Sequence, residues 1–194
     1  KTFPDNEQVC FFYDQNGNLE RLAQPGTPLL IGPADAHDFV SDNRDMLQTY
    51  NPPAIGLPNH DTTFLYTADA DLDLVTRPDA LTVDPSYDAA GRLSGVVAPG
   101  NTIAYNYFAN GDPTAPGKLE QITTSQDGVT IGYTYAGRLL TSTAWSGPVS
   151  GLVSLTYDND LRVTSDTVAG DTATYVYGDA DGLLTQAGAL SLTL

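Results

Sequence analysis

The residues that could carry catalysis are few in this chain. A serine hydrolase needs a nucleophile, a histidine base and an orienting acid, and the 194-residue sequence has only two histidines, His37 and His60. The G-x-S-x-G nucleophile motif is absent from the sequence. His60 lies in a Pro-Asn-His-Asp segment, which predicts a solvated histidine. We therefore expect no catalytic residues and no enzyme activity.

Acidic residues are abundant, with 24 Asp and Glu against 8 Lys and Arg, for a net charge of −16. Only Glu7, Glu20 and Glu120 are glutamates, and none lies in a motif that would pair carboxylates for glycoside cleavage. A chain this acidic repels phosphate backbones and anionic lipids, so we expect neither nucleic-acid binding nor association with an anionic membrane surface. No stretch approaches the roughly 18–20 apolar residues of a membrane span, so we expect no membrane insertion. The aspartates cluster in predicted turns, where they favour local backbone bonding and solubility.

Calcium is the metal to consider. Asp69–Asp73 and Asp14–Asn18 place oxygen donors on alternate residues, as a calcium loop does. The bidentate glutamate expected at position 12 is Ala80 in the first segment and Pro25 in the second. Two histidines and the single Cys10 cannot form a four-ligand zinc site without carboxylates. We expect no metal and no cofactor, and a calcium-dependent enzyme is kept as a third interpretation.

Trp145, the only tryptophan, lies in the turn-like segment Ala144–Pro148. An exposed indole there would be a platform on which a sugar ring could stack. The alternative is a large side chain that covers the apolar face between two hairpins. The sequence leaves both roles open.

These residues are embedded in a phrase that recurs along the chain, typified by Tyr87–Leu93 (YDAAGRL). From the second clear copy onward, successive copies start 21, 20, 28, 22 and 20 residues apart, and the long interval contains the insertion Gly111–Gly117. A decayed copy is predicted near Phe39. Such a period indicates a repeat architecture. The predicted repeat anchors are Tyr13, Tyr66, Tyr87, Tyr107, Tyr135, Tyr157 and Tyr177.

Each copy reads as strand, turn, strand, turn. Thr102–Tyr107, Val129–Tyr135 and Thr172–Tyr177 are rich in β-branched and aromatic residues, with tyrosines two apart on one strand face. Asp, Asn and Gly follow in turn positions, while 18 glycines and 13 prolines interrupt any helical period. We expect an all-β fold of consecutive antiparallel hairpins in a continuous curved sheet, with almost no helix. Tyrosines of neighbouring hairpins are expected to stack on one another.

The predicted organisation is one architectural unit over residues 1–194. Residues 1–64 are irregular, with prolines at Pro25–Pro33 and Pro52–Pro58, and residues 65–194 carry regular repeats of about 20–22 residues. The sequence reads as an excerpt of a longer protein, so its neighbouring repeats are expected partners. Strand edges left unpaired at the two ends also predict self-association.

The unit Y-x-Y-D-x-x-G-R-L, with Tyr87–Leu93 and the preceding Arg77–Asp79 as its clearest example, resembles the YD repeat of the rearrangement-hotspot (Rhs) family. Related repeats occur in insecticidal toxin complexes and teneurins, and the resemblance spans about Phe11 to Leu194. It implies a β-strip that spirals into a hollow shell, which in bacterial members encloses a toxic C-terminal domain. Asp84-Pro85 and Asp112-Pro113 lack the glycines of the family's self-cleaving motif.

The resemblance implies a noncatalytic scaffold, part of the encapsulating shell of a secreted or surface-located bacterial protein, with a C-terminal toxin cargo as partner. A carbohydrate-binding or adhesive module is the alternative. Some copies drift from the family pattern: the Tyr135 copy is two residues short, Asp160-Leu161 is read as replacing the Gly-Arg pair, and Ala80 replaces a turn glycine.

Overall fold

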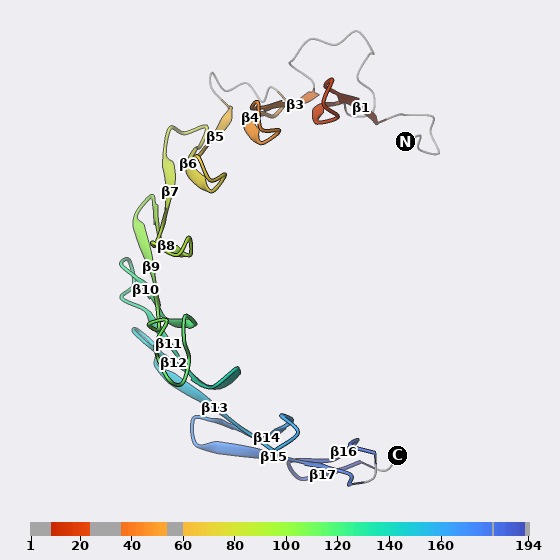
Figure 1. Ribbon diagram of the computed structural model, residues 1–194, viewed down its shortest axis with the longest axis vertical. Helices are drawn as coiled ribbons and strands as arrows, with labels where there is room; N and C mark the ends of the chain where they lie inside the picture. The colour runs from red at the N-terminus through yellow and green to blue at the C-terminus, as the bar shows by residue number, and fades with distance from the viewer. Residues whose placement is uncertain (1–8, 24–35, 54–59, 180, 193–194) are drawn as a thin grey trace. The chain divides into compact units, whose positions relative to one another are not determined.

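The computed structural model describes residues 9–23, 36–53, 60–179 and 181–192. Over these ranges the chain is all-β, with seventeen antiparallel strands and no helix (Figure 1). The predicted fold class, consecutive antiparallel hairpins, is thereby confirmed. No helix in the described ranges could span a membrane. The prolines predicted to interrupt the chain at Pro25–Pro33 lie outside the described residues.

The chain divides into two compact units. The N-terminal unit comprises residues 1–88 and 96–99, and the C-terminal unit comprises residues 89–95 and 100–194. The first eight strands are β1 (Cys10–Tyr13), β2 (Leu19–Ala23), β3 (Ala36–Ser41), β4 (Leu47–Asn51), β5 (Thr62–Tyr66), β6 (Leu72–Thr76), β7 (Thr82–Tyr87) and β8 (Leu93–Ala98). The remaining nine are β9 (Asn101–Tyr107), β10 (Leu119–Thr124), β11 (Thr130–Ala136), β12 (Leu139–Ser146), β13 (Gly151–Tyr157), β14 (Val163–Val168), β15 (Asp171–Tyr177), β16 (Leu184–Ala187) and β17 (Leu190–Ser191).

Strands pair in the order in which they occur in the sequence. Each strand from β1 to β7 is hydrogen-bonded to the next within the N-terminal unit. The same holds from β9 to β17 in the C-terminal unit. Every hairpin therefore has its chain neighbours as its structural neighbours, as a repeat architecture requires.

The hairpins that contain an anchor position, where their register is described, carry a register shift close to the turn. The shift falls between the anchor residue and the residue before it, so that the anchor lies opposite the residue that begins or nearly begins the second strand. A β-bulge of this kind leaves a residue outside the ladder and increases the local twist. The opposed pairs are Tyr13 with Leu19, Tyr66 with Leu72, Tyr107 with Leu119, Tyr135 with Leu140, Tyr157 with Val163, and Tyr177 with Leu184.

The decayed copy predicted near Phe39 is a true hairpin of β3 and β4, but Phe39 is not its anchor. The register shift falls between Val40 and Ser41, and Ser41 lies opposite Leu47. Ser41 therefore occupies the anchor position, and Phe39 corresponds to the aromatic residue two positions earlier in the other copies.

The turn after the anchor contains a position with a left-handed backbone conformation. In several copies the residue four after the anchor has a left-handed backbone, with φ of 90° at Gly17, 75° at Gly91 and 66° at Leu161. Glycine adopts this conformation without steric cost, whereas a β-carbon is penalised. Leu161 therefore replaces the glycine, and Arg162 keeps the arginine position. The predicted replacement of Gly-Arg by Asp160-Leu161 is wrong by one residue.

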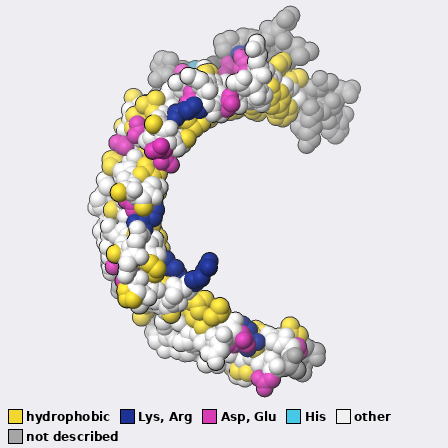
Figure 2. Space-filling view, viewed as in Figure 1, with side chains coloured by type: hydrophobic (Ala, Val, Ile, Leu, Met, Phe, Trp, Pro, Cys, Tyr) yellow, Lys and Arg dark blue, Asp and Glu magenta, His cyan; other side chains and the backbone are white. Residues whose placement is uncertain are grey.

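A layer of hairpins has little interior. Among the described residues the buried hydrophobic side chains are Ala23, Ala36 and Ala115, and larger apolar side chains keep some solvent exposure. Figure 2 shows apolar and acidic side chains interspersed over the visible surface of the units. Contacts between adjacent hairpins must therefore supply most of the stability.

Candidate functional site

The recurring structural element of the chain is a hydrogen bond that joins one hairpin to the next, which we call the tyrosine link. In each link, an anchor hydroxyl donates to a backbone carbonyl at the start of the second strand of the preceding hairpin. The donor–acceptor pairs are Tyr66 to Leu47 (3.0 Å), Tyr87 to Leu72 (3.0 Å), Tyr107 to Leu93 (2.8 Å), Tyr135 to Leu119 (2.9 Å), Tyr157 to Leu140 (2.7 Å) and Tyr177 to Val163 (2.9 Å).

The links follow from the bulges. Leu72 lies opposite the anchor Tyr66 and accepts the hydroxyl of the next anchor, Tyr87. The accepting carbonyl thus lies at the register shift, where ladder pairing is interrupted. A hydroxyl that satisfies such a partly buried carbonyl removes a desolvation penalty of about 1–3 kcal/mol. Each anchor therefore closes its own hairpin and also fastens it to the preceding one.

The expected stacking of anchor tyrosines on one another is wrong. The ring pairs among the described residues are His37 with Tyr50, Phe39 with Tyr50, and Phe108 with Tyr135, so none joins two anchors. Equivalent residues of successive hairpins are two strands apart, about 9.5 Å at ordinary strand spacing. This exceeds the ring separation of about 4.5–7 Å over which aromatic pairs interact. The hydroxyl, at the far end of the side chain, spans the gap instead.

Three links in the C-terminal unit carry a cation over the tyrosine ring. Arg92 lies 4.1 Å from the ring centroid of Tyr107, and Arg162 lies 4.6 Å from that of Tyr177. Lys118 lies 4.4 Å from the ring centroid of Tyr135, whose pKa is raised by burial and by neighbouring Tyr133. Each cation directly precedes the residue whose carbonyl accepts the hydroxyl. Sequence reasoning missed this role, although a basic residue before Leu or Val at the start of the second strand is a visible signal.

The inserted loop between Phe108 and Lys118 is built into its surroundings. The Asp112 carboxylate accepts hydrogen bonds from the Thr114 hydroxyl and from the Thr114 and Ala115 backbone N–H groups, which lower the pKa of Asp112. Outside the loop, Arg92 donates to the Gly117 carbonyl at 2.9 Å.

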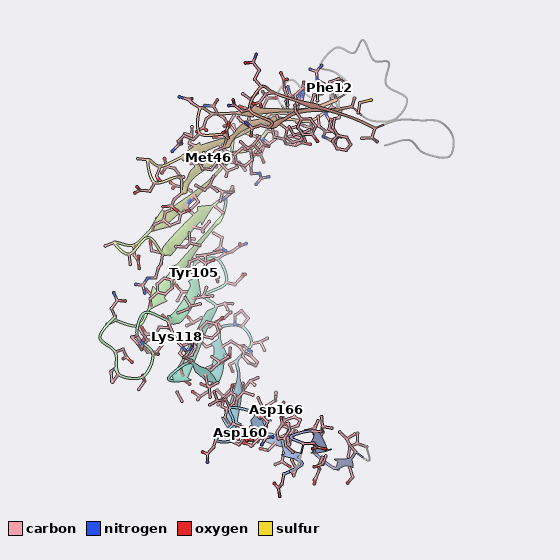
Figure 3. The ribbon with its side chains drawn as sticks, turned by 45° about the vertical axis from the view of Figure 1, so that its right-hand side comes forward. Phe12, Met46, Tyr105, Lys118, Asp160 and Asp166 are labelled. Atoms are coloured by element: carbon pink, nitrogen blue, oxygen red, sulfur yellow. The ribbon has the colours of Figure 1, made fainter. Side chains whose placement is uncertain are left out.

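At the other end of the loop, the ammonium of Lys118, which is labelled in Figure 3, donates to the Gly137 carbonyl at 2.6 Å. The Arg92 and Lys118 contacts connect the loop to the hairpins before and after it. The insertion thus keeps the repeat continuous where its spacing lengthens.

Aspartates after the anchors act as turn caps. Asp14 Oδ1 accepts the backbone N–H groups of Asn16 and Asn18. Asp158 Oδ1 accepts those of Asp160 and Arg162. Hydrogen bonds from Asn18, through side chain and backbone, lower the pKa of Asp14, and the Arg162 backbone N–H is the largest cause of the lowered pKa of Asp158. These carboxylates therefore stabilise loops in their ionised form.

Asp42 repeats this arrangement in the hairpin of β3 and β4. Partial desolvation raises its pKa, but hydrogen bonds from the Met46 and Arg44 backbone N–H groups outweigh that effect and leave the pKa lowered. No group of three His, Cys, Asp or Glu side chains within the described ranges is arranged to hold a metal ion. Asp14, the first residue of one calcium-like segment, instead binds the backbone of its own turn.

The two histidines occupy different surroundings. Nδ1 of His37 lies 2.7 Å from the Tyr50 hydroxyl. Nδ1 of His60 is buried and has no hydrogen-bond partner in the described part of the chain, while the residue as a whole is half-exposed, so its solvation stays a prediction. Cys10 is a free thiol that is partly buried at the start of β1.

Trp145 packs on the backbone of its neighbouring strand. It lies opposite Gly151 in the pairing of β12 and β13. A β-carbon added to Gly151 would lie 2.1 Å from the indole ring, so this close approach requires glycine. A role of Trp145 in binding a glycan stays a prediction.

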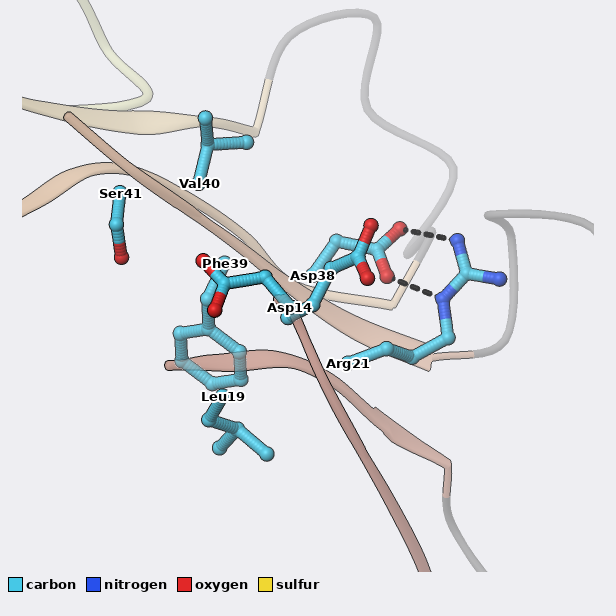
Figure 4. Close-up of a pocket in the computed structure, with 8 residues that line it drawn as sticks. Asp14, Leu19, Arg21, Asp38, Phe39, Val40 and Ser41 are labelled. Atoms are coloured by element: carbon cyan, nitrogen blue, oxygen red, sulfur yellow. Dashed lines mark hydrogen bonds and ion pairs between the residues drawn. The ribbon is translucent and has the colours of Figure 1, made fainter. Parts of the chain in front are cut away.

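Each unit carries a hollow of ligand size on its described surface. One, of about 360 Å³ in the N-terminal unit, is lined by residues of β2 and β3 together with Asp14 (Figure 4). The guanidinium of Arg21 and the carboxylate of Asp38 form a two-point ion pair there, with Nη2 donating to Oδ2 at 2.9 Å. Because Arg21 and Asp38 neutralise each other, neither charge is free to bind a ligand in this hollow. The second hollow, in the C-terminal unit, measures about 320 Å³.

Comparison with known proteins finds a family and a fold. The family model described as Teneurin YD-shell matches residues 2–194. A chain in the structure of the Photorhabdus luminescens Tc holotoxin pore aligns with a TM-score of 0.70 and 14% identity over 94% of this chain. A chain in the crystal structure of TcdB2-TccC3-TEV aligns with a TM-score of 0.59 and 15% identity over 91% of this chain. The sequence spans 10% of each of these solved chains. No curated protein matches it.

Proposed function

Because this chain belongs to the teneurin YD-shell family, as its YD repeats predicted, we propose that it is a noncatalytic scaffold that forms a stretch of shell wall. The wall would belong to a larger bacterial protein that is secreted or located at the cell surface. Its role would be to separate an enclosed C-terminal cargo domain from proteases and other proteins until delivery.

The tyrosine links support this proposal best. Six anchors fasten their hairpins to the preceding ones through backbone carbonyls. A backbone acceptor places no demand on the side chain of the partner residue, so the sequence of each repeat can vary while the connection persists. This suits a wall, whose task is to remain continuous over many copies.

Charge and surface chemistry agree with a wall function. The net charge of −16 disfavours association with nucleic acid and anionic lipid. Asp14 and Asp158 accept hydrogen bonds from the backbone of their own turns, which gives these carboxylates a structural role. In the described part of the chain, the polar side chains described above stabilise turns and link strands.

Limited proteolysis tests the proposal on a longer chain that carries a C-terminal cargo domain. We expect cargo attached to the repeats to be cleaved far more slowly than free cargo. The double variant Tyr107→Phe/Tyr135→Phe should accelerate cleavage of the cargo, because two successive links are lost. Tyr13→Phe is the matched control, since the described structure gives the Tyr13 hydroxyl no link. Equal cleavage of the cargo with and without the repeats would remove the proposal.

A carbohydrate-binding or adhesive role is the second candidate, and the observation that favours it is the partly exposed indole of Trp145 held against Gly151. A glycan array with the 194-residue chain tests it. Binding that is reproducible and lost in Trp145→Ala would support this role. An array without reproducible binders would exclude it and leave the scaffold.

End-to-end association is a further expectation from the strand order. Within the described ranges, β1 pairs only with β2, and β17 pairs only with β16. An open strand edge recruits another strand. Sedimentation velocity should show concentration-dependent association of the isolated chain, and a monomer at all concentrations would contradict it.

A further inference from the structure

The hollow of the C-terminal unit departs chemically from the rest of the repeat. It has a volume of about 320 Å³, within the usual range for small-ligand sites. Four consecutive strands, β13 to β16, contribute to it. Its lining residues are Leu155, Val163, Asp166, Tyr175, Tyr177 and Leu184.

Two departures from the repeat coincide at this hollow. The first departure concerns the residue two positions before the anchor. In every hairpin of described register except that of β13 and β14, this residue is aromatic and lies opposite an uncharged residue. These pairs are Phe11 with Leu22, Phe39 with Tyr50, Phe64 with Val75, Tyr105 with Ile122, Tyr133 with Thr143, and Tyr175 with Ala187. In the hairpin of β13 and β14, the pair is Leu155 with Asp166. A ring is lost and a carboxylate is gained at the same place.

The neighbouring strand adds space. Asp166 lies opposite Ala173 on its other side, so only a methyl group faces it there. Tyr175, two residues along β15 from Ala173, lies on the same strand face. The Asp166 carboxylate therefore lines the hollow together with aliphatic and aromatic side chains.

Asp166 has no cationic partner within the described residues, as judged by the ion pairs of that part of the chain. The nearest basic residue in sequence, Arg162, is engaged by Asp158 at 2.8 Å and Asp160 at 3.1 Å. The raised pKa of Tyr175 has the charge of Asp166 as its largest cause, followed by burial and by a side-chain hydrogen bond with Asp166. Asp166 thus has a hydroxyl neighbour but no cation among the described residues, and a partly buried carboxylate is costly unless its charge is paired.

We propose that this hollow binds an alkylammonium group, with Asp166 as its counter-ion and the Tyr175 ring as its aromatic wall. The C-terminal unit already uses the same chemistry internally, since cations lie over the rings of Tyr107, Tyr135 and Tyr177. Here the aromatic ring and the carboxylate are present, and an external ligand supplies the cation. This inference does not depend on the proposed shell role.

An alkylammonium group can come from a free amine or from a lysine side chain of a polypeptide. The probes are n-butylammonium and a lysine tripeptide with blocked ends, titrated into the 194-residue chain. Chemical-shift changes of the tyrosine ring signals, measured by NMR, report binding. Tighter binding of the simple amine assigns a free amine as the ligand, and tighter binding of the tripeptide assigns a polypeptide.

Charge-matched variants make the test specific. Asp166→Asn removes the carboxylate with almost no change of shape, and we expect it to weaken n-butylammonium binding at least tenfold. Asp171→Asn, an exposed position at the start of β15, removes one charge from the chain outside the hollow and should leave affinity unchanged. Far-UV circular dichroism confirms that both variants fold.

Three results would overturn the proposal. Equal weakening by Asp166→Asn and Asp171→Asn would reduce the effect to diffuse attraction by an acidic chain. Chemical-shift changes with neutral n-butanol equal to those with n-butylammonium would show that the hollow binds the alkyl chain and that the charge contributes nothing. The absence of any saturable shift with either ammonium probe would show that nothing of this class binds there.

Discussion

The two units of the chain use the same tyrosine link with different reinforcement. In the N-terminal unit, Tyr66 and Tyr87 each donate at 3.0 Å. The residues before their acceptors are Met46 and Asp71, and within the described part of this unit neither ring carries a cation. In the C-terminal unit three of the four links carry Arg or Lys over the ring.

The difference separates what the link requires from what strengthens it. Tyr157 in the C-terminal unit donates at 2.7 Å with Leu139 before its acceptor, so the hydroxyl and the bulge are sufficient for the bond. A cation over the ring adds about 0.5–1 kcal/mol at an exposed position. Each cation-bearing link of the C-terminal unit should therefore contribute more to the free energy of unfolding than a link of the N-terminal unit.

Acidification should produce the largest effect, because it removes several turn caps at once. The pKa values of Asp14 and Asp42 in one unit, and of Asp112 and Asp158 in the other, are lowered from the ordinary 3.8. A lowered folded pKa contributes stability that is fully present above the unfolded value and is lost as pH falls through the folded value. Both units should therefore lose stability below about pH 4.

Urea unfolding followed at several pH values checks this prediction, with hydrogen exchange to resolve the units. Asp158→Asn keeps the Oδ1 acceptor but abolishes the charge, so the stability of the C-terminal unit should depend less on pH. Asp160→Asn is its control, because this side chain is 74% exposed. An unchanged pH profile in Asp158→Asn would contradict the assignment of Asp158 as a charged cap.

Loss of one hydroxyl is the next largest effect. Tyr66→Phe and Tyr135→Phe each leave a carbonyl without its donor, and each should lower the free energy of unfolding of its unit by about 1 kcal/mol. Tyr13→Phe should cost less than about 0.3 kcal/mol, since the Tyr13 side chain is largely exposed and links to nothing in the described structure. If all three variants lose the same amount, the links do not carry the connection between hairpins.

Turn strain should give a smaller effect of opposite sign. Leu161 and Ala70 hold the left-handed turn position with φ of 66° and 69° in the C-terminal and N-terminal units. Leu161→Gly and Ala70→Gly should stabilise their units by about 0.5–1 kcal/mol, because relief of strain exceeds the added entropy of the unfolded chain. Thermal melting measures the gain. Destabilisation by both would show that the repeat does not need glycine at this position.

The sequence predicted the hairpins well because their signals are local. Tyrosines two apart, a turn of Asp, Asn and Gly, and a fixed period define strand, bulge and turn within a single copy. Leu161 was misplaced because apolar leucine is a poor marker of a left-handed turn. Once the turn geometry is known, its position and that of Arg162 agree with the other copies.

The links and the hollow were harder to predict because they join different copies. A hydroxyl bonded to a backbone carbonyl requires no polar side chain at the accepting residue, so Leu47 and Val163 look like ordinary strand residues. The stacking expectation failed because it ignored the two-strand distance between equivalent rings. Asp166 is a carboxylate at a position where the other copies have uncharged residues. This difference can be recognised only once the register shifts show which positions of the copies are equivalent.

Exchange of the residue before the acceptor is the smallest and sharpest test of the comparison. Lys118→Met should weaken the C-terminal unit by about 0.5 kcal/mol, and Met46→Lys should strengthen the N-terminal unit by a similar amount. The ammonium of Lys118 also donates to Gly137, so Lys118→Met is paired with Tyr135→Leu in a double-mutant cycle that isolates the contact with the ring. Hydrogen exchange measured on each unit gives the two changes in one experiment. A coupling energy of zero between Lys118 and Tyr135, together with no gain in Met46→Lys, would mean that the cations above the rings are neighbours of the links rather than part of them.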